Sequence, residues 1–255
     1  MASVPFLKRL PLAERWRLAA EADGLARIAA TGAIRVPRVL GEGANRTEAW
    51  LELERLELHP ADGASDARMG AALARLHATT AGEFGLERDN AIGATAQPNA
   101  PAHDWIDFWR ERRLRFQLEL AARNGHGGRL QERGGRLLES LPAFFEGHRP
   151  QPSLLHGDLW GGNRAMLADG TPVVFDPAAY HGDREAELAM TRLFGGFGPR
   201  FYATYERAWP LASGAAERRE LYNLYHVLNH LNLFGGGYRA QADAMIDRLL
   251  AAVGR

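Results

Sequence analysis

The chain has 255 residues, of which 46% are hydrophobic and 24% are charged, a composition typical of a globular protein with one large or two modest domains. It has no cysteine, which excludes disulfides, thiolate metal sites and cysteine nucleophiles. Its 31 Lys and Arg balance its 31 Asp and Glu, so no overall charge attracts nucleic acid or an anionic membrane. No apolar run reaches the roughly 20 residues of a spanning helix, and no export signal is visible. We therefore expect a cytoplasmic protein with neither nucleic-acid nor membrane partners.

Arginine supplies all but one of the cationic side chains, and the exception is Lys8. Lysine carries a compact charge suited to a phosphate oxygen or a buried carboxylate, whereas the guanidinium of arginine is a planar fork. The exception is either chance or a chemical requirement at this position, and the composition alone does not decide between the two.

The first elements in the chain are a short strand at residues 4–7 and a helix at about residues 12–30. The helix carries an apolar stripe at helical spacing, made by Leu18, Ala22, Leu25, Ile28 and Ala29. Glu21 falls within this stripe. A carboxylate there either lies at the edge of the stripe and reaches water or pairs with a cation, and the nearest preceding cation on a strand is Lys8.

The pattern changes after Leu58, which places a domain boundary near residues 55–60. Before it, residues 36–39 and 49–53 read as strands joined by a turn at 41–46. After it, Ser65-Asp66 is the predicted start of a helix. The connection at residues 82–102 is long enough to predict a functional loop or lid. Further helices are predicted from Asp104 and at about 130–141, 184–193, 200–208, 217–233 and 240–253.

A hairpin interrupts the helical part, with strands at 164–167 and 171–175 and a turn at Asp169-Gly170. Asp158 and Asn163 precede the hairpin, and Asp176 follows it. Protein kinases place a catalytic Asp, a metal-binding Asn and a second metal-binding Asp in this order and spacing. Carboxylate and amide oxygens suit Mg²⁺, and a carboxylate can also accept a proton from a hydroxyl. The alternative is a polar turn whose side chains only satisfy their own backbone.

The segment from Leu154 to Asn163, followed by Phe175-Asp176-Pro177-Ala178 and by residues 180–185, closely resembles the fructosamine kinase (ketosamine 3-kinase) family. This family belongs to the protein-kinase-like, aminoglycoside-phosphotransferase-like group. The similarity covers nearly the whole chain and includes residues 21–25, Val36-Pro37, residues 73–77, Gln97-Pro98-Asn99, Trp105 with Phe108, residues 194–197 and residues 228–232.

The resemblance implies an α+β, protein-kinase-like, two-lobed fold, with a truncated N-terminal lobe at 1–57 and a mostly helical C-terminal lobe at 58–255. It implies an ATP- and Mg²⁺-dependent kinase acting on a sugar hydroxyl of a ketosamine that is either a small molecule or protein-bound. The roles that it implies are Asp158 as base, Asn163 and Asp176 as metal ligands, Lys8 and Glu21 at the nucleotide phosphates, Glu54, Arg55 and Leu56 as the adenine-binding hinge, and Trp160 and His230 as substrate contacts.

The sequence departs from the family pattern in two places. Family members carry a glycine-bearing hairpin, the flap over the phosphates, before the lysine strand, whereas only seven residues precede Lys8 here. We therefore expect the flap to be absent, catalysis to be weak and the sheet edge at residues 5–7 to be prone to self-association. At Glu187 the family pattern has an Asp that braces the catalytic loop, and the longer side chain predicts a modest shift.

Other functions fit the sequence less well. Gly41-Glu42-Gly43 lacks the third glycine of a dinucleotide-binding turn, and no phosphate loop or GxSxG motif occurs. His226 and His230 have a spacing that can bind zinc, but they form no HExxH motif. Two alternatives to the ketosamine kinase stay open: a non-catalytic kinase-like remnant, and a kinase for another amino sugar or amino alcohol. The identity of the sugar amine and the oligomeric state are not determined by the sequence.

Overall fold

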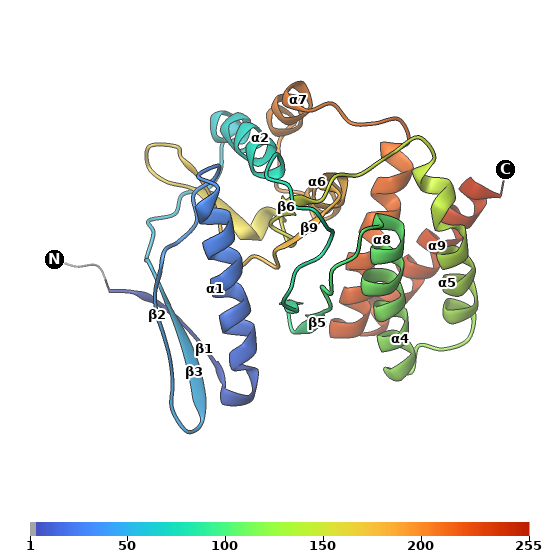
Figure 1. Cartoon of the computed structure of the whole chain (residues 1–255), viewed down its shortest axis with the longest axis horizontal. Helices are drawn as coiled ribbons and strands as arrows, with labels where there is room; N and C mark the ends of the chain where they lie inside the picture. Colours follow the sequence, from blue (N-terminus) through green and yellow to red (C-terminus); the bar gives the residue numbers. More distant parts are fainter. Residues whose placement is uncertain (1–3, 255) are drawn as a thin grey trace. The chain divides into compact units, whose positions relative to one another are not determined.

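The computed structural model describes residues 4–254, and Figure 1 labels most of their helices and strands. The chain forms two compact units. The first unit comprises Met1–Thr80, Ser153–Tyr180 and Phe194–Pro210, and the second comprises Ala81–Pro152, His181–Leu193 and Leu211–Arg255. These units group the chain differently from the lobes expected at 1–57 and 58–255, and that lobe boundary stays a prediction.

The first unit begins with an antiparallel sheet of order β1-β3-β2, formed by β1 (Phe6–Pro11), β2 (Val39–Ala44) and β3 (Glu48–Leu53). The central strand β3 alternates, burying Ala49, Leu51 and Leu53 against α1 (Arg15–Ala30). A short 3₁₀ turn at Leu12–Glu14 precedes α1. The predicted turn at 41–46 is wrong in part, because residues 41–44 extend β2. The reversal is instead made by Asn45, whose Oδ1 accepts hydrogen bonds from the main-chain N–H of Thr47 and Glu48.

Strand β1 lies at one edge of this sheet, where Phe6 and Leu7 are more than a third exposed. An edge strand presents main-chain groups on which a further strand can pair. The self-association expected at this edge stays a prediction.

The rest of the first unit is built on α2 (Gly63–His77), which packs against α7 (Pro199–Ala208), β6 (Ser153–Leu155) and β8 (Pro172–Val174). The predicted helix start at Ser65-Asp66 is three residues late. Asp62 is the N-cap and accepts from the main-chain N–H of Ala64 and Ser65, and the Ser65 hydroxyl in return accepts from the N–H of Asp62. Because Ser65 is the partner in a reciprocal cap, it resembled the cap itself in the sequence.

The second unit is mainly helical and has an aromatic core in which Trp105, Trp109 and Tyr222 contact one another. The expected loop at 82–102 contains a small hairpin, β4 (Asn90–Ile92) with β5 (Thr95–Gln97). The remaining elements are α3 (Trp105–Phe108), a π-helical turn (Trp109–Arg115), α4 (Phe116–Arg123), α5 (Arg129–Ser140), a 3₁₀ turn (Leu141–Phe145), α6 (Arg184–Leu193), α8 (Ala215–Phe234), a 3₁₀ turn (Gly236–Tyr238) and α9 (Arg239–Val253); β9 (Tyr180–Gly182) precedes α6. Across residues 4–254, no helix is both long and apolar enough to cross a membrane.

Candidate active site

The predicted hairpin brings the two halves of the kinase-like motif together within the first unit. Its strands are β7 (Arg164–Met166) and β8, paired from Arg164 opposite Val174 to Met166 opposite Pro172. The ladder continues one step further, because the N–H of Phe175 donates to the carbonyl of Asn163 at 3.1 Å. The segments that carry Asn163 and Asp176 therefore lie side by side at the open end of the hairpin.

Asp158 and Asn163 are in direct contact. The Asn163 side-chain Nδ2 donates to the main-chain carbonyl of Asp158 at 2.9 Å and to its Oδ2 at 3.2 Å. This use of Nδ2 leaves Oδ1 as the ligand atom that Asn163 can offer to a metal. Asn163 is buried and Asp158 is half-buried, so the carboxylate is held in place but remains accessible to a substrate.

Gly157 and His156 fix the backbone just before Asp158. Gly157 has a φ of 85°, and a Cβ there would lie 2.0 Å from the carbonyl oxygen of Ala178, so only glycine fits. The ring of His156 bridges the two halves of the site: Nε2 lies 2.9 Å from the carbonyl of Phe175, and Nδ1 accepts from the N–H of Asp158 at 3.3 Å.

Arg164, the residue after Asn163, is held by Asp66 of α2 and by the loop at 194–198. Its guanidinium pairs with Asp66 at 2.6 Å, donates to the carbonyl of Gly196 and lies 4.1 Å above the ring of Phe197. A Cβ on Gly196 would lie 2.6 Å from the Cα of Gly161, so the two loops touch through glycines. The contact gives a structural reason for the Phe-Gly-Gly-Phe segment that the family resemblance singled out.

Asp176 is exposed and adopts the left-handed conformation with a φ of 59°, which no other non-glycine residue does between residues 4 and 254. A strained backbone at one acidic residue is often a feature of a functional site. Its Oδ1 lies 2.6 Å from Nζ of Lys8. The second oxygen of Asp176 and Oδ1 of Asn163 are hard oxygen donors of the kind that Mg²⁺ prefers, so the chemistry of these residues fits that metal.

Lys8 also pairs with Glu21, as the sequence pattern suggested. Nζ of Lys8 lies 2.7 Å from Oε1 of Glu21, and the two side chains are only 23% and 15% exposed. Burial by itself lowers the pKa of Lys8, but the charges of Glu21 and Asp176 outweigh it and raise that pKa above its usual value. Burial raises the pKa of Glu21, and Lys8 offsets this only in part. One ammonium therefore sits between two carboxylates.

A cavity of about 340 Å³ opens beside this ammonium, within the size range of small-molecule sites. It is lined by Phe6, Lys8, Pro37, Leu53, Glu54, Arg55, Leu56, Leu58, Phe175 and Asp176. All three residues predicted as a hinge line it. The Glu54 carboxylate accepts hydrogen bonds from Arg35 and Arg38. Desolvation would raise the pKa of Glu54, but these hydrogen bonds lower it below its usual value. The Arg55 side chain donates to the carbonyl of Val4.

The two predicted substrate contacts lie in different units. Trp160 follows the catalytic-loop leucine in the first unit and is 40% exposed. His230 lies on α8 in the second unit, where its Nδ1 is 2.8 Å from the carbonyl of His226. Within the described part of the chain, neither His226 nor His230 belongs to a group of three or more histidine and carboxylate side chains that could hold a metal ion. Glu187 is buried on α6.

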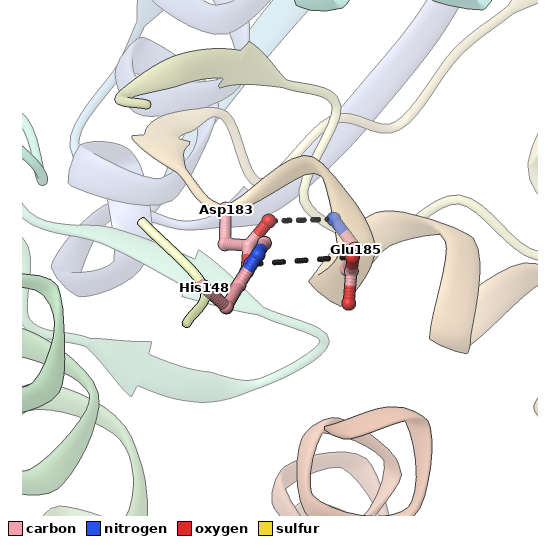
Figure 2. Close-up of side chains that lie close together, drawn as sticks. All are labelled: His148, Asp183 and Glu185. Carbon is pink, nitrogen blue, oxygen red and sulfur yellow. Dashed lines mark hydrogen bonds and ion pairs between the residues drawn. The ribbon is translucent and has the colours of Figure 1, made fainter. Parts of the chain in front are cut away.

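Sequence reasoning missed a polar cluster in the second unit, formed by the half-buried His148 and the buried Asp183 and Glu185 (Figure 2). Nε2 of His148 is 2.7 Å from Oδ2 of Asp183 and 4.0 Å from Oε1 of Glu185. The spacing of these atoms would suit a metal, but other side chains already occupy them. Arg218 binds both oxygens of Glu185, at 2.8 and 3.2 Å, and the hydroxyl of Tyr222 donates to Asp183.

These contacts make the cluster a charge-paired structural network. Desolvation would raise the pKa of Asp183, but hydrogen bonds from His148, Tyr222 and the Glu185 N–H lower it. Burial and the neighbouring Asp183 raise the pKa of Tyr222 well above its usual value. The only signal in the sequence was the segment Asp183-Arg184-Glu185, whose partners lie more than 30 residues away.

Comparison with known proteins places these features in a family. The family model described as fructosamine kinase matches residues 5–252. The chain is 45% identical over 247 residues to a probable ketoamine kinase of Synechocystis sp., which covers 96% of this chain and 83% of that protein. It is 42% identical over 233 residues to a chloroplastic protein-ribulosamine 3-kinase of Oryza sativa subsp. indica, covering 90% and 68% of the two chains.

Solved structures agree with these matches. A crystal structure of a presumed fructosamine-3-kinase from Haemophilus somnus superimposes with a TM-score of 0.88 at 31% identity, covering 96% of this chain and 83% of that one. The choline kinase LicA of Streptococcus pneumoniae matches with a TM-score of 0.63 at 12% identity, covering 97% and 85%, and thus shares the fold alone. The chain therefore belongs to the fructosamine kinase family and has the protein-kinase-like fold that its catalytic-loop segment predicted.

Proposed function

We propose that this chain transfers the γ-phosphoryl group of ATP to a sugar hydroxyl of a ketosamine. The observation that carries the proposal is the continuous arrangement within the first unit: the Asp158–Asn163 pair, the adjoining Asp176 and the Lys8–Glu21 pair at the edge of one cavity. A family kinase needs these groups at the acceptor hydroxyl, the metal and the phosphates.

In this mechanism the cavity at Glu54, Arg55 and Leu56 receives the adenine, with the main chain providing the polar contacts and Leu53 and Phe6 the apolar ones. Lys8 places its ammonium on the phosphates, and Glu21 keeps Nζ positioned and charged. Asn163 and Asp176 would hold Mg²⁺, which supplies charge neutralisation on the phosphate oxygens.

Asp158 orients the acceptor hydroxyl and takes its proton as the new P–O bond forms and the bond to ADP breaks. Asn163 keeps the Asp158 carboxylate in place by donating to it. The exposed ring of Trp160, two residues along, would contact the sugar.

The acceptor is a ketosamine, either small or protein-bound. The relatives include probable ketoamine kinases and a protein-ribulosamine 3-kinase, which favours this acceptor over another amino sugar or an amino alcohol and favours an enzyme over a non-catalytic remnant. We infer that both glucose-derived and ribose-derived ketosamines deserve testing, because the names of the relatives point to more than one sugar.

The test is incubation of the purified chain with Mg·ATP and ketosamines prepared from Nα-acetyl-lysine with glucose or ribose. Formation of ADP and a new phosphate monoester signal in ³¹P NMR are expected, and the Asp158→Asn variant should form neither. Choline and free fructose serve as acceptor controls. Binding of Mg·ATP without phosphorylation of either ketosamine would instead support the remnant, and turnover of choline alone would support the amino-alcohol kinase.

A further inference from the structure

A second cavity in the first unit, of about 560 Å³, is not explained by the kinase reaction. It is lined by Ala29, Gly32, Ala33, Ile34, Arg35, Val36, Arg38, Arg68, Ala71, Ala72, Arg75, Thr171 and Pro172. None of the proposed catalytic, metal or nucleotide residues is among them. Pro37 lines the 340 Å³ cavity proposed to receive ATP, the nucleotide cavity, whereas Val36 and Arg38 line the second cavity. The segment 35–38 therefore forms part of the wall of both cavities.

The helix α2 forms one wall with a regular pattern of large and small side chains. Arg68, Ala71, Ala72 and Arg75 are spaced by three, four and seven residues, so they share one face of the helix. The two alanines leave a hollow between the arginines, which stand about 10 Å apart along the axis. The buried apolar residues Ala33, Ile34 and Val36 also line the cavity, and we call them its floor. The arginines that line the cavity form its rim.

Backbone carbonyls hold the arginines of α2 in place without neutralising them. Nε of Arg68 donates to the carbonyl of Gly170 at 2.7 Å, and Arg75 donates to that of Ala33 at 3.0 Å. Each guanidinium has five N–H donors, so both keep donors for a ligand. Neither arginine forms an ion pair with any residue in the part of the chain that the structure describes, 4–254.

The surrounding carboxylates leave an excess of positive charge. Arg35 and Arg38, on the facing wall, share the single carboxylate of Glu54. Asp62 and Asp169 lie near enough for Arg68 to contribute to their lowered pKa values, after the larger effect of hydrogen bonds at their own turns. Four arginines and no carboxylate line the cavity, and within residues 4–254 Arg75 forms no ion pair.

We propose that this cavity binds a small organic anion that has an apolar body, such as an aryl or alkyl phosphate. The guanidinium fork matches two oxygens of a phosphate or carboxylate, and a fork that already donates to a main-chain carbonyl loses less freedom on binding. The apolar floor accepts the body of the ligand, and the volume lies within the range of small-molecule sites. A neutral molecule would leave the excess charge of the rim unmatched.

The experiment uses phenyl phosphate, a dianion on an apolar ring, titrated by calorimetry into the full chain with and without ADP and Mg²⁺. One site is expected in both cases, with a Kd between about 10 µM and 1 mM, the range for a ligand of roughly ten non-hydrogen atoms. Benzyl alcohol should show no saturable binding. The test requires no turnover, so its outcome is independent of whether the chain phosphorylates a ketosamine.

Two variants locate the site. The double substitution Arg68→Gln/Arg75→Gln should weaken binding of phenyl phosphate at least about tenfold, the effect of losing charge-assisted hydrogen bonds. Arg46→Gln/Arg149→Gln removes the same charge from exposed positions elsewhere and should leave the Kd unchanged. Ala71→Phe should abolish binding by filling the hollow. The proposal is overturned by no saturable binding, by complete displacement with ADP, or by equal affinity in the Arg68→Gln/Arg75→Gln variant.

Discussion

The amide of Asn163 holds Asp158 at two points, the main-chain carbonyl and the carboxylate. A single side chain thus fixes both the backbone and the rotamer of Asp158. Because Nδ2 is used in this way, Oδ1 is the atom left for a metal. The proposed metal site and the proposed acceptor site are therefore connected through one amide group.

Replacing the proposed base, Asp158, should impair phosphoryl transfer without impairing nucleotide binding. In Asp158→Asn the new amide cannot accept the proton of the acceptor hydroxyl, and kcat should fall by about 10²- to 10⁴-fold. The Kd for Mg·ATP should stay close to that of the parent, because Asp158 does not line the nucleotide cavity. The matched control is Asp169→Asn in the turn of the same hairpin, which should keep full activity. A kcat within about tenfold of the parent in Asp158→Asn would contradict the assignment.

Removing the proposed metal ligand Asp176 should change the response of ATP binding to Mg²⁺. The Asp176→Ala variant loses a hard oxygen donor, so we expect the increase in ATP affinity that Mg²⁺ gives to disappear. Calorimetry with ATP in Mg²⁺ and in EDTA measures this increment. Asp176 also pairs with Lys8, so Lys8→Met is the necessary comparison. That variant should lose affinity for ATP and still respond to Mg²⁺, and the same loss of response in both variants would move the metal site elsewhere.

Lysine and arginine should not be interchangeable at position 8. Two carboxylates converge on the compact Nζ at 2.6 and 2.7 Å, and a planar guanidinium cannot take the same place between them. We expect Lys8→Arg to raise the KM for ATP and lower kcat, each by about tenfold or more. The reverse exchange at the next residue, Arg9→Lys, concerns an exposed pair with Glu48 and should be nearly neutral. Steady-state kinetics at varied ATP compare the two, and near-parent kinetics in Lys8→Arg would argue against a phosphate contact.

His226 should make the protein sensitive to acid. Burial, helped by the charges of His230 and Arg113 and opposed by Glu187, lowers the pKa of His226 to about 3 from an ordinary 6.5. As the pH falls below about 6.5, His226 is therefore protonated in the unfolded chain but stays neutral in the folded chain. The contribution of neutral His226 to the free energy of unfolding is complete above pH 6.5 and is lost as the pH falls toward 3. The loss amounts to about 1.4 kcal/mol per pH unit, or about 2 kcal/mol between pH 7.5 and 5.

Urea unfolding at pH 7.5 and 5 measures this effect, and His226→Gln should reduce the difference between the two pH values by that amount. His103→Gln replaces a histidine that is 87% exposed and should leave the difference unchanged. A pH dependence that is the same in His226→Gln and in the parent would assign the acid sensitivity to other groups.

The network around His148, Asp183 and Glu185 (Figure 2) predicts that replacing Arg218 lowers the free energy of unfolding much more than replacing its neighbour Arg219. Arg218→Met leaves the buried Glu185 without its cation, which should lower the free energy of unfolding by about 3 to 5 kcal/mol. Arg219 is exposed, and Arg219→Met should change that free energy by less than about 0.5 kcal/mol. Chelators should not affect the stability of the parent, because the carboxylates are bound by protein groups. Destabilisation by EDTA would instead reveal a metal at His148, Asp183 and Glu185.

The sequence was most informative where a residue type conflicted with its surroundings. A lone lysine and an acid in an apolar stripe pointed to the Lys8–Glu21 pair, and kinase spacing around a turn pointed to Asp158, Asn163 and Asp176. Contacts between segments that lie far apart in the sequence gave no such signal. Arg164 meets Asp66 across about a hundred residues, and Arg218 meets Glu185 only when α6 and α8 pack together. The hairpin β4–β5 was missed because its short strands lie in a segment punctuated by Gly85, Gly93 and Pro98, which is typical of a loop.

Because Lys8 is the only lysine, the chain offers a single side-chain amine to reagents that acylate amines. Its only lysine side chain lines the nucleotide cavity, and both of its neighbouring carboxylates keep it protonated and therefore weakly nucleophilic. General amine-directed reagents will consequently leave the side chains of this protein largely unmodified. A reagent delivered by a nucleotide, in contrast, has one lysine to acylate, so a single modified peptide in a mass spectrum reports occupancy of the cavity.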